Sequence, residues 1–562
     1  MTATSAPLES DFPDGAGAPR IRVAEWVCLG AVLVLHAVFL ERVKLLTVDD
    51  ALITIRQARN LVEGYGFVYN PGGPRVESYT NHLLFLWQAL TLWLGGNALT
   101  STKLLGAAGS SALIVGAWLL ARDLVRWSGA GLERLPAPVL FFGPLLLAIS
   151  PLVTFGAMAG LETALFGGLV TLGVWQVLRV FHGEALPWGA GALFGLALWT
   201  RPEGLIWLVG YGVVLGLVAW RQGRAWKPLA VALATGLGFW LALAVFRLAV
   251  FGRLHPNTYY IKMAGDPVGR FFSGLNYVRD WAVLNFGFGW IALGVAAAFL
   301  QLPARRAPAL VVLLGLLGHL VLVAVEGGDW MPHLRLIAPA MGIALGLAAT
   351  GVALAWLRVA PRLGRAFRPV AAVGTLVLAF GAYQIVLAEE YRAFGEAQTR
   401  IFGWNDAHIP LGKWLGEWQL RRLAADREGL TVAIEDIGWV GWYSEAQIVD
   451  LAGLADPDWA REVYDSGREA VYPAGPLIHD VRPEVVVLVS LTGPRESPRR
   501  ILWPSNKAIY THPDFLKNYR EKVIFTHKDF PGDGYFLHVF LRNDVFDEPP
   551  AVTPPKARAV GR

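Results

Sequence analysis

The sequence predicts an α-helical polytopic membrane protein with a C-terminal α/β-type domain outside the bilayer. Of the 562 residues, 54% are hydrophobic and only 17% are charged, whereas a soluble globular domain carries about 25% charged residues. Long apolar runs continue to residue 389 and are then replaced by shorter ones. The net charge of +5 is modest and collects in short loops, so nucleic-acid binding has little support. The single Cys28 excludes an intramolecular disulfide and a cysteine metal cluster.

Eleven apolar runs are candidates to cross a bilayer, which takes about 20 residues. They cover residues 24–43, 101–121, 137–153, 160–179, 187–200, 204–220, 228–250, 283–300, 308–325, 335–357 and 369–388. The first run lacks a small-residue cleavage site and is expected to stay as a helix, and residues 1–22 are expected to form a disordered cytoplasmic tail. The run 82–95 has only fourteen residues. It is assigned to an interfacial helix within a long first outer loop, residues 44–100.

Basic residues in the loops indicate how the chain is oriented in the membrane. With the N-terminus in the cytoplasm, the inward loops contain Arg122, Arg126, Arg134, Arg179, Arg221, Arg224, Lys227, Arg305, Arg306, Arg358, Arg362, Arg365 and Arg368. The short outward loops carry few basic residues, as the positive-inside rule expects. If 82–95 were a full span, the later basic loops would lie outside. We therefore expect a multi-pass protein of the inner (plasma) membrane, with residues 23–389 as its transmembrane domain.

From about residue 390 the pattern is that of a small soluble domain. TVAIEDIGWVGW, PEVVVLVSL and GYFLHVFLRN are predicted to form short strands, and WNDAHIPLGKWLGEWQLRRLAADRE an amphipathic helix. Residues 390–545 are thus expected to form the α/β-type domain, and the span count puts it in the extracytoplasmic space. Residues 546–562 are expected to be a disordered tail.

Six groups of polar residues fall on the extracytoplasmic side of this topology. In chain order they contain Asp49, Asp50 and Arg56; Glu77, Tyr79 and Asn81; Glu162; Arg201 and Glu203; His255, Asn257, Tyr259 and Lys262; and Glu326, Asp329, His333 and Arg335. Each has a plain structural explanation on its own, such as helix capping, a turn, or pairing at the interface. Unpaired charges near the bilayer centre cost about 2.5–3.5 kcal/mol each. Six such groups at one face therefore predict a shared polar cavity.

The segment after Asp50 is expected to be a helix lying along the membrane surface. Its apolar face would carry Leu52, Ile55, Ala58 and Val62, and its polar face Arg56, Arg59 and Glu63. The sequence contains no Walker-type phosphate loop, no HExxH or cysteine–histidine metal spacing, and no GxSxG. These absences leave nucleotide hydrolysis and serine-hydrolase chemistry without support.

The motifs together resemble the GT-C superfamily of polyprenyl-phosphate-dependent glycosyltransferases. They are the acidic pair after the first span, RQARNLVEGYGFVYNPG, RVESYTN, GLET, TRPEG, PNTYYIK and GGDWMPHLR. The likeness is greatest to the branch with the terminal arabinofuranosyltransferases of the mycobacterial envelope. It covers about residues 45–340, with a looser likeness around IEDIGWVGWYSEAQIVDLAGL. The chain departs from the branch pattern at Ser78 and His82.

The resemblance implies transfer of a sugar, with arabinofuranose expected, from a polyprenyl-phosphate donor to a cell-envelope glycan. Asp49 or Asp50 would be the general base that takes the proton of the acceptor hydroxyl. The donor phosphate or sugar would be bound by Arg201, His255, Tyr259, Lys262, His333 and Arg335, with Trp330 as a packing surface. The acceptor would be contacted, or the site supported, by Arg56, Glu77, Tyr79, Asn81, Glu162, Glu203, Asn257 and Asp329. No cofactor is required by the motifs, and a divalent cation on Asp49 and Asp50 is the alternative hypothesis.

Two other functions compete with the transferase. A lipid or sugar transporter or flippase usually carries its ionisable groups near the membrane midplane, often in inverted repeats. Here the charges lie at helix ends and no repeat is found. An inactive glycan-binding assembly protein on the same scaffold is the other alternative. Retention of the acidic pair together with Arg201, Lys262 and Arg335 argues against it.

Overall fold

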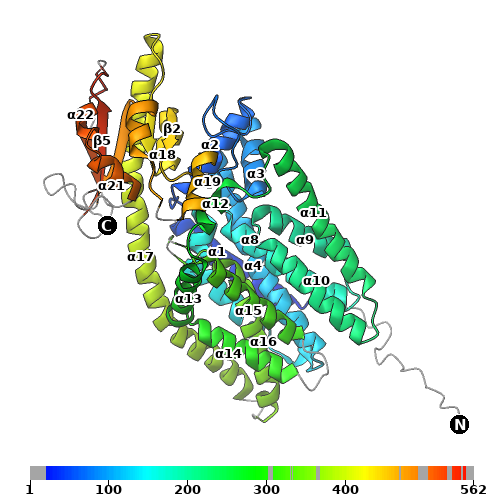
Figure 1. Ribbon diagram of the computed structural model, residues 1–562. Helices are drawn as coiled ribbons and strands as arrows, with labels where there is room; N and C mark the ends of the chain where they lie inside the picture. Colours follow the sequence, from blue (N-terminus) through cyan, green and yellow to red (C-terminus); the bar gives the residue numbers. More distant parts are fainter. Residues whose placement is uncertain are drawn as a thin grey trace.

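The computed structural model combines a bundle of long helices with an α/β domain at one end of it (Figure 1). It describes residues 21–301, 308–329, 331, 333–362, 367–467, 470–490, 504–527, 534–545 and 548–551. The predicted fold class, a polytopic helical protein with a C-terminal α/β domain, is confirmed. The two terminal tails predicted at 1–22 and 546–562 lie almost wholly outside the described residues.

Seven helical segments within the described ranges are long and apolar enough to cross a membrane. They are α1 (Val23–Arg42), α4 (Ala98–Trp127), α8 (Thr163–Phe181), α10 (Gly204–Arg221), α11 (Lys227–Phe251), α15 (Pro308–Glu326) and the joined segment of η3 (Ala338–Ala340), α16 (Met341–Val359) and η4 (Ala360–Arg362). A further pair, α13 (Pro267–Leu284) and α14 (Gly287–Gln301), would make one span bent by 80°. Each of these overlaps a predicted apolar run.

The predicted run 137–153 is not one continuous helix. It is divided into α5 (Ala137–Leu140), α6 (Phe142–Ile149) and the start of α7 (Pro151–Met158), after the short turn η1 (Leu132–Arg134). Ser150 between α6 and α7 is extended, with a ψ of 124°. A residue that precedes proline is disfavoured in the helical region, which explains the break before Pro151.

The remaining two predicted runs differ in how far the structure describes them. Residues 187–200 form α9 (Pro187–Thr200), a 14-residue helix that packs between α8 and α11. Residues 369–388 lie inside α17 (Phe367–Ala424), where the backbone is helical and the side chains are not described. The total of eleven spans stays a prediction.

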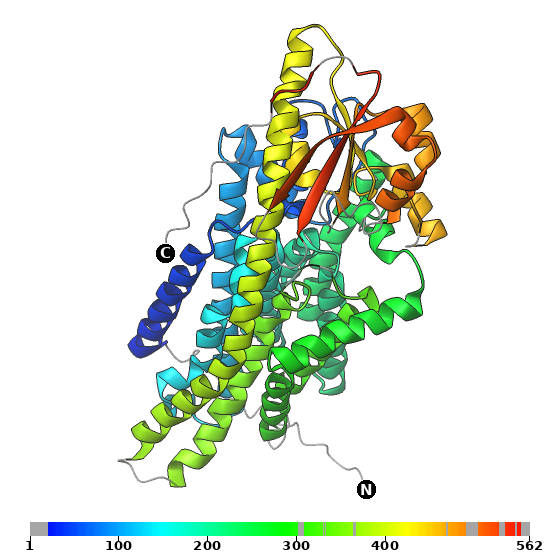
Figure 2. The same cartoon turned by 90° about the vertical axis from the view of Figure 1, so that its left-hand side faces the viewer.

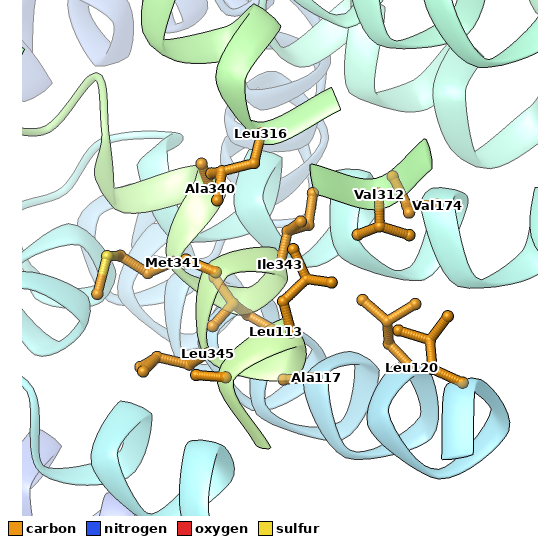
Figure 3. Close-up of a cluster of buried hydrophobic side chains, with 14 of the residues drawn as sticks. Leu113, Ala117, Leu120, Val174, Val312, Leu316, Ala340, Met341, Ile343 and Leu345 are labelled. Atoms are coloured by element: carbon orange, nitrogen blue, oxygen red, sulfur yellow. The ribbon is translucent and has the colours of Figure 1, made fainter. Parts of the chain in front are cut away.

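The core of the bundle is formed by α4, α8, α15 and α16. Figure 3 shows apolar side chains of these helices packed together, including Leu113 of α4, Val174 of α8, Val312 of α15 and Ile343 of α16. Close approach depends on small residues, because a Cβ on Gly109 of α4 would lie 2.5 Å from the backbone of α8. This rigid core fixes the helix ends that carry the polar residues.

The first outer loop contains two helices, α2 (Asp50–Val62) and α3 (His82–Trp93). An apolar helix is therefore present as α3 where one was predicted at 82–95, and its place at the membrane interface stays a prediction. The expectation that α2 exposes a polar face is wrong at Arg56, whose side chain is 1% exposed. The reason is that the α/β domain covers this side of α2 through α18 (Ile437–Ser444).

The α/β domain contains a five-stranded sheet in the order β2-β1-β3-β5-β4. Its strands are β1 (Thr431–Ile434), β2 (Gln447–Asp450), β3 (Val485–Ser490), β4 (Tyr519–His527) and β5 (Tyr535–Arg542). β1 runs parallel to β2 and β3, and β5 runs antiparallel to β3 and β4. The predicted strands correspond to β1, β3 and β5, but IGWVGW belongs to α18. The other helices are α19 (Pro457–Ser466), α20 (Ala474–Pro476), η5 (Leu477–Val481), α21 (Pro504–Thr511) and α22 (Phe515–Asn518).

Helix α17 joins the bundle to the α/β domain without interruption. It has 58 residues and runs from one end of the molecule to the other (Figure 2). Its C-terminal part packs Leu411, Trp414, Leu415 and Trp418 against the sheet. The predicted amphipathic helix is thus present, but the domain boundary expected at 390 falls inside one helix.

Candidate active site

Asp50 occupies the first position of α2, directly after the loop that leaves α1. Burial raises the pKa of its carboxyl group to about 6, and the nearby positive charges of Arg335 and Lys262 oppose that rise. The carboxylate makes no hydrogen bond to any residue that the structure describes. Asp50 is therefore a half-buried acid held close to cations and left open for a ligand.

Arg335 comes from the GGDWMPHLR segment between α15 and α16. Its Nε donates a hydrogen bond to Asp329, and both side chains are buried. Asp50 and Glu162 also act on Arg335 as neighbouring negative charges. Asp50 and this loop, about 280 residues later in the chain, therefore belong to one polar site.

Arg201 brings three further motifs together. Its guanidinium donates to Glu162 at 2.7 Å and to Glu203 at 2.5 Å. Asn81 donates from its side-chain amide to the other oxygen of Glu162 at 2.8 Å. The guanidinium of Arg201 holds the pKa of both glutamates below the usual value despite their burial. ESYTN, GLET and TRPEG thus meet in one ionic network.

Lys262 lies on α12 (Asn257–Met263), the short helix after α11. The residue is accessible to solvent, yet the surrounding protein lowers the pKa of its ammonium group, and so do the positive charges of Arg335 and Arg201. The acids Asp329 and Glu162 act in the opposite direction. A cation that other cations crowd in this way would be stabilised by an added anion. The polar site, defined here as Asp50, Glu162, Arg201, Lys262 and Arg335, can accordingly receive a phosphate.

Asp49 has different surroundings from Asp50. Its two carboxylate oxygens accept hydrogen bonds from the backbone N–H groups of Gly438, at 2.8 Å, and Trp439, at 2.7 Å. Both donors belong to the first turn of α18 in the α/β domain. Burial raises the pKa of Asp49, whereas these two N–H groups lower it. The sequence left Asp49 and Asp50 as equal candidates for the general base. In the structure, the carboxylate of Asp49 is occupied by backbone N–H groups, whereas that of Asp50 is not.

A second group of predicted site residues surrounds Glu77. Its carboxylate accepts two hydrogen bonds from Arg247 of α11, at 2.8 and 2.9 Å, with both side chains buried. Tyr79 stacks on Phe85, with ring centroids 4.5 Å apart. Arg247 was not among the predicted residues, although a lone arginine inside an apolar run signals a buried partner.

His255 and Tyr259 lie on the same side of the structure as this second group. Their rings stack with centroids 4.2 Å apart. His255 lines a cavity of about 110 Å³ together with Arg75, Glu77 and Arg253. The structure joins none of these described residues to Asp50 by a hydrogen bond or an ion pair. Asn81 and Lys262 nevertheless belong to the same two motifs and lie in the ionic network around Arg201 and Arg335, and the shared polar cavity stays a prediction.

Arg56 and Asn257 anchor the α/β domain to the bundle. Arg56 donates to the carbonyl oxygens of Gly441, at 2.5 Å, and Ala446, at 2.8 Å. The side-chain amide of Asn257 donates to the carbonyl oxygen of Gly453 at 2.8 Å and of Leu454 at 2.9 Å. Their donors are directed at backbone carbonyls of the domain, which the sequence alone could not reveal.

His333 adopts a left-handed backbone conformation with a φ of 63°. Its ring lies against Phe155 with centroids 4.6 Å apart. Burial lowers the pKa of the imidazole to about 4, so the ring is neutral at pH 7. It can contribute a hydrogen bond but not a positive charge. Trp330, predicted as a packing surface, lies outside the described residues.

The donor set around Asp49 and Asp50 does not fit a divalent cation well. Both oxygens of Asp49 already accept backbone N–H groups. Asp50 alone remains, and the positive charges of Arg335 and Lys262 act on it. Elsewhere in the described chain, His479, His512 and Asp514 bring their ligand atoms within 4.8 Å of one another at the surface of the domain.

An apolar cavity of about 140 Å³ lies between α10 and α15. Its lining includes Trp207, Gly210, Tyr211, Gly318 and His319. The His319 imidazole lies within the electrostatic reach of Glu203 and Arg201. The cavity therefore lies between two helices that are apolar enough to span a membrane, and His319 is the lining residue on which the charges of the polar site act.

Comparison with solved structures places this architecture among known proteins. ArnT from Cupriavidus metallidurans bound to undecaprenyl phosphate superimposes with a TM-score of 0.52 at 16% identity, over 92% of this chain and 98% of that one. The archaeal oligosaccharyltransferase AglB from Archaeoglobus fulgidus, in complex with an inhibitory peptide and a dolichol-phosphate, gives a TM-score of 0.51 at 13% identity, over 83% and 70%. The chain has the GT-C fold. The fold that the motif resemblance implies is thereby confirmed.

Two curated relatives extend the likeness to the branch. Proteins named terminal beta-(1->2)-arabinofuranosyltransferase from Mycobacterium tuberculosis and Corynebacterium glutamicum are each 29% identical, over 302 and 347 residues. These matches cover 51% and 53% of this chain, which spans just under half the length of either relative, 46% and 47%. Residues 392–539 of the GT-C chain match a family described as a domain of unknown function, DUF8728.

Proposed function

We propose that this GT-C protein is a membrane glycosyltransferase that moves a sugar from a polyprenyl-phosphate donor to a cell-envelope glycan. The observation that carries the proposal is the open, half-buried carboxylate of Asp50 beside the cations Arg335 and Lys262. Arabinofuranose is the proposed sugar because both curated relatives bear that name. Decaprenyl-phosphoryl arabinose is the proposed donor.

Asp50 acts as the general base. The acceptor hydroxyl must lose its proton as its oxygen attacks the anomeric carbon, and the Asp50 carboxylate takes that proton. With a pKa of about 6, the group is mostly ionised at pH 7 and still basic enough to accept a proton. A positioned general base accelerates such a step by about 10²–10⁴-fold.

Lys262 and Arg335 stabilise the leaving group. The bond between the anomeric carbon and the phosphate oxygen breaks, and its electron pair stays on the lipid phosphate. Arg335 is fixed by Asp329, and Arg201 is fixed by Glu162 and Glu203. Cations held in this way need no reorganisation as negative charge develops on the phosphate.

The apolar cavity between α10 and α15 suits a short part of the prenyl chain of the donor. It lies between membrane-spanning helices, and its His319 is within the electrostatic influence of Arg201 and Glu203. An isoprenoid would bury apolar surface there while its phosphate binds the cations of the polar site. The likeness to ArnT, which was solved with undecaprenyl phosphate, supports a lipid-phosphate donor.

The reaction is proposed to take place on the extracytoplasmic face of the inner (plasma) membrane. Nucleotide sugars are made in the cytoplasm, so a site outside it needs a sugar carried across on lipid. The predicted inward loops are rich in arginine, and two of those arginines pair with buried acids, Arg122 with Glu25 and Arg126 with Asp123. Their positive charge favours the cytoplasmic side for that end of the bundle.

The decisive experiment is a transfer assay with purified protein in nanodiscs. Radiolabelled decaprenyl-phosphoryl arabinofuranose and a panel of other polyprenyl-phosphate sugars would each be mixed with a synthetic arabinofuranose trisaccharide. We expect a labelled tetrasaccharide with at least one donor. The same donors in proteoliposomes would measure translocation. Translocation without transfer would identify a flippase and refute the proposal.

A further inference from the structure

The contact between Asp49 and α18 joins the two parts of the chain at the catalytic loop. The first N–H groups of a helix have no partner within the helix and carry its partial positive charge. Asp49 satisfies those of Gly438 and Trp439 at 2.8 and 2.7 Å. The acid and its donors are 389 and 390 positions apart in the sequence. Such a long-range cap fixes the backbone immediately before Asp50.

The backbone at Gly438 leaves no room for a side chain. A Cβ at this position would lie 2.0 Å from the backbone oxygen of Asp49 and 2.6 Å from its Oδ2. Real Cβ atoms do not approach backbone atoms so closely, so any residue other than glycine would push the two segments apart. The fit of α18 against the loop therefore depends on this glycine.

Further hydrogen bonds hold the same loop. The indole N–H of Trp439 donates to the side-chain oxygen of Asn405 on α17 at 2.7 Å. The amide of Asn405 donates to the carbonyl oxygen of Thr47 at 2.9 Å. Thr47, Asp49, Asn405, Gly438 and Trp439 are together called the latch.

The domain side of the latch is fixed to the sheet. Asp436, directly before α18, accepts a hydrogen bond from the hydroxyl of Tyr535 on β5 at 2.7 Å. The imidazole of His408 on α17 lies 3.2 Å from the same carboxylate oxygen. The start of α18 is thus held by two other elements of the domain, and the latch joins a rigid domain to the loop.

We propose that Asp49 is a positioning residue and that the latch makes the α/β domain part of the active site by fixing the orientation of Asp50. The inference rests on the proposed role of Asp50 as the base. It assigns a task to the segment 392–539, whose family is described only as a domain of unknown function. A displacement of about 1 Å at a catalytic group can cost about 10²-fold in rate. Loosening the latch should therefore lower kcat without removing the base.

The test compares variants on both sides of the latch. Asp49→Ala and Gly438→Ala should each lower kcat by about 10–100-fold while the donor KM changes less than about twofold. Asp49→Asn should recover much of that loss, because its amide oxygen still accepts one N–H. The pH at which the kcat of Asp49→Asn falls to half on the acid side should stay close to that of the wild type. Gly395→Ala, with nothing within 4 Å of the new Cβ, is the matched control.

The contrary result is equally clear. If Asp49→Asn is as inactive as Asp50→Asn while Gly438→Ala keeps full activity, Asp49 is the base and the proposal is overturned. If Gly438→Ala fails to fold, the comparison of Asp49→Asn with Asp49→Ala decides alone.

Hydrogen exchange provides a readout that does not depend on turnover. The amides of residues 438 and 439 should exchange faster in Asp49→Ala than in the wild type, because their acceptor is lost. Unchanged exchange would refute the latch. An inactive wild-type protein with normal protection of these amides would instead refute the proposed function alone.

Discussion

Replacing Asp50 with asparagine should abolish transfer and make the protein more stable. The pKa of Asp50 is about 6, against an ordinary value of 3.8. Each pKa unit corresponds to about 1.4 kcal/mol. Because the folded state holds the proton more tightly than the unfolded state, the buried anion lowers stability as the pH rises from about 4 to about 6. Above that range the cost is constant at about 3 kcal/mol.

Thermal unfolding in detergent and transfer kinetics would measure both effects. At pH 7.5 the Asp50→Asn variant should gain about 1–3 kcal/mol, since the neutral amide also has a smaller desolvation cost. At pH 4.5 the gain should shrink to about a third, because the wild-type carboxyl is then mostly protonated. Turnover should fall by about 10²–10⁴-fold. Asp465→Asn, at an exposed acid of α19, is the control. A variant that is less stable at pH 7.5, or still active, would refute the reasoning.

Three further predictions follow from the site. First, kcat/KM should rise with pH, reach half of its plateau near pH 6 and level off above about 7, with a rate at pH 5 about tenfold below the plateau, because Asp50 must be ionised; initial rates that fall as the pH rises would contradict this. Second, Lys262→Met should lower kcat/KM for the donor by about 10–100-fold, as expected for a lost charged hydrogen bond, while Lys522→Met in β4 should have no effect in the same assay. Third, Gly318→Leu, which projects into the cavity between α10 and α15, should raise the KM of a decaprenyl donor more than that of a short-prenyl donor. Gly216→Leu on α10, which does not line the cavity, should change the KM of the two donors to the same extent.

Apolar runs were sufficient to predict most of the membrane helices, because bilayer-spanning helices need length and hydrophobicity above all. They failed where local backbone chemistry intervened, as at the Ser150–Pro151 break. They also failed along α17, where one helix leaves the apolar segment and continues as an amphipathic helix under the sheet. A change in composition marks a change of environment, not the end of a helix.

The polar site was predictable as a set of residue types but not as a geometry. Asp50, Arg201, Lys262 and Arg335 were each expected from motifs, and the structure brings them into one electrostatic neighbourhood. The difference between Asp49 and Asp50 depends on α18, which comes almost 390 residues later. Neighbouring identical residues give no signal of such distant partners. The ion pair between Glu77 and Arg247 was more predictable, because a lone arginine in an apolar run requires an acidic partner.

The central claim is that Asp50 and the cations face one bound lipid phosphate. A cryo-electron microscopy map of the protein with a non-transferable polyprenyl-phosphonate sugar would test it most directly. The account predicts that the phosphonate contacts Lys262 and Arg335, with the sugar between it and Asp50. A phosphonate bound away from these cations, or a sugar that Asp50 cannot reach, would contradict it.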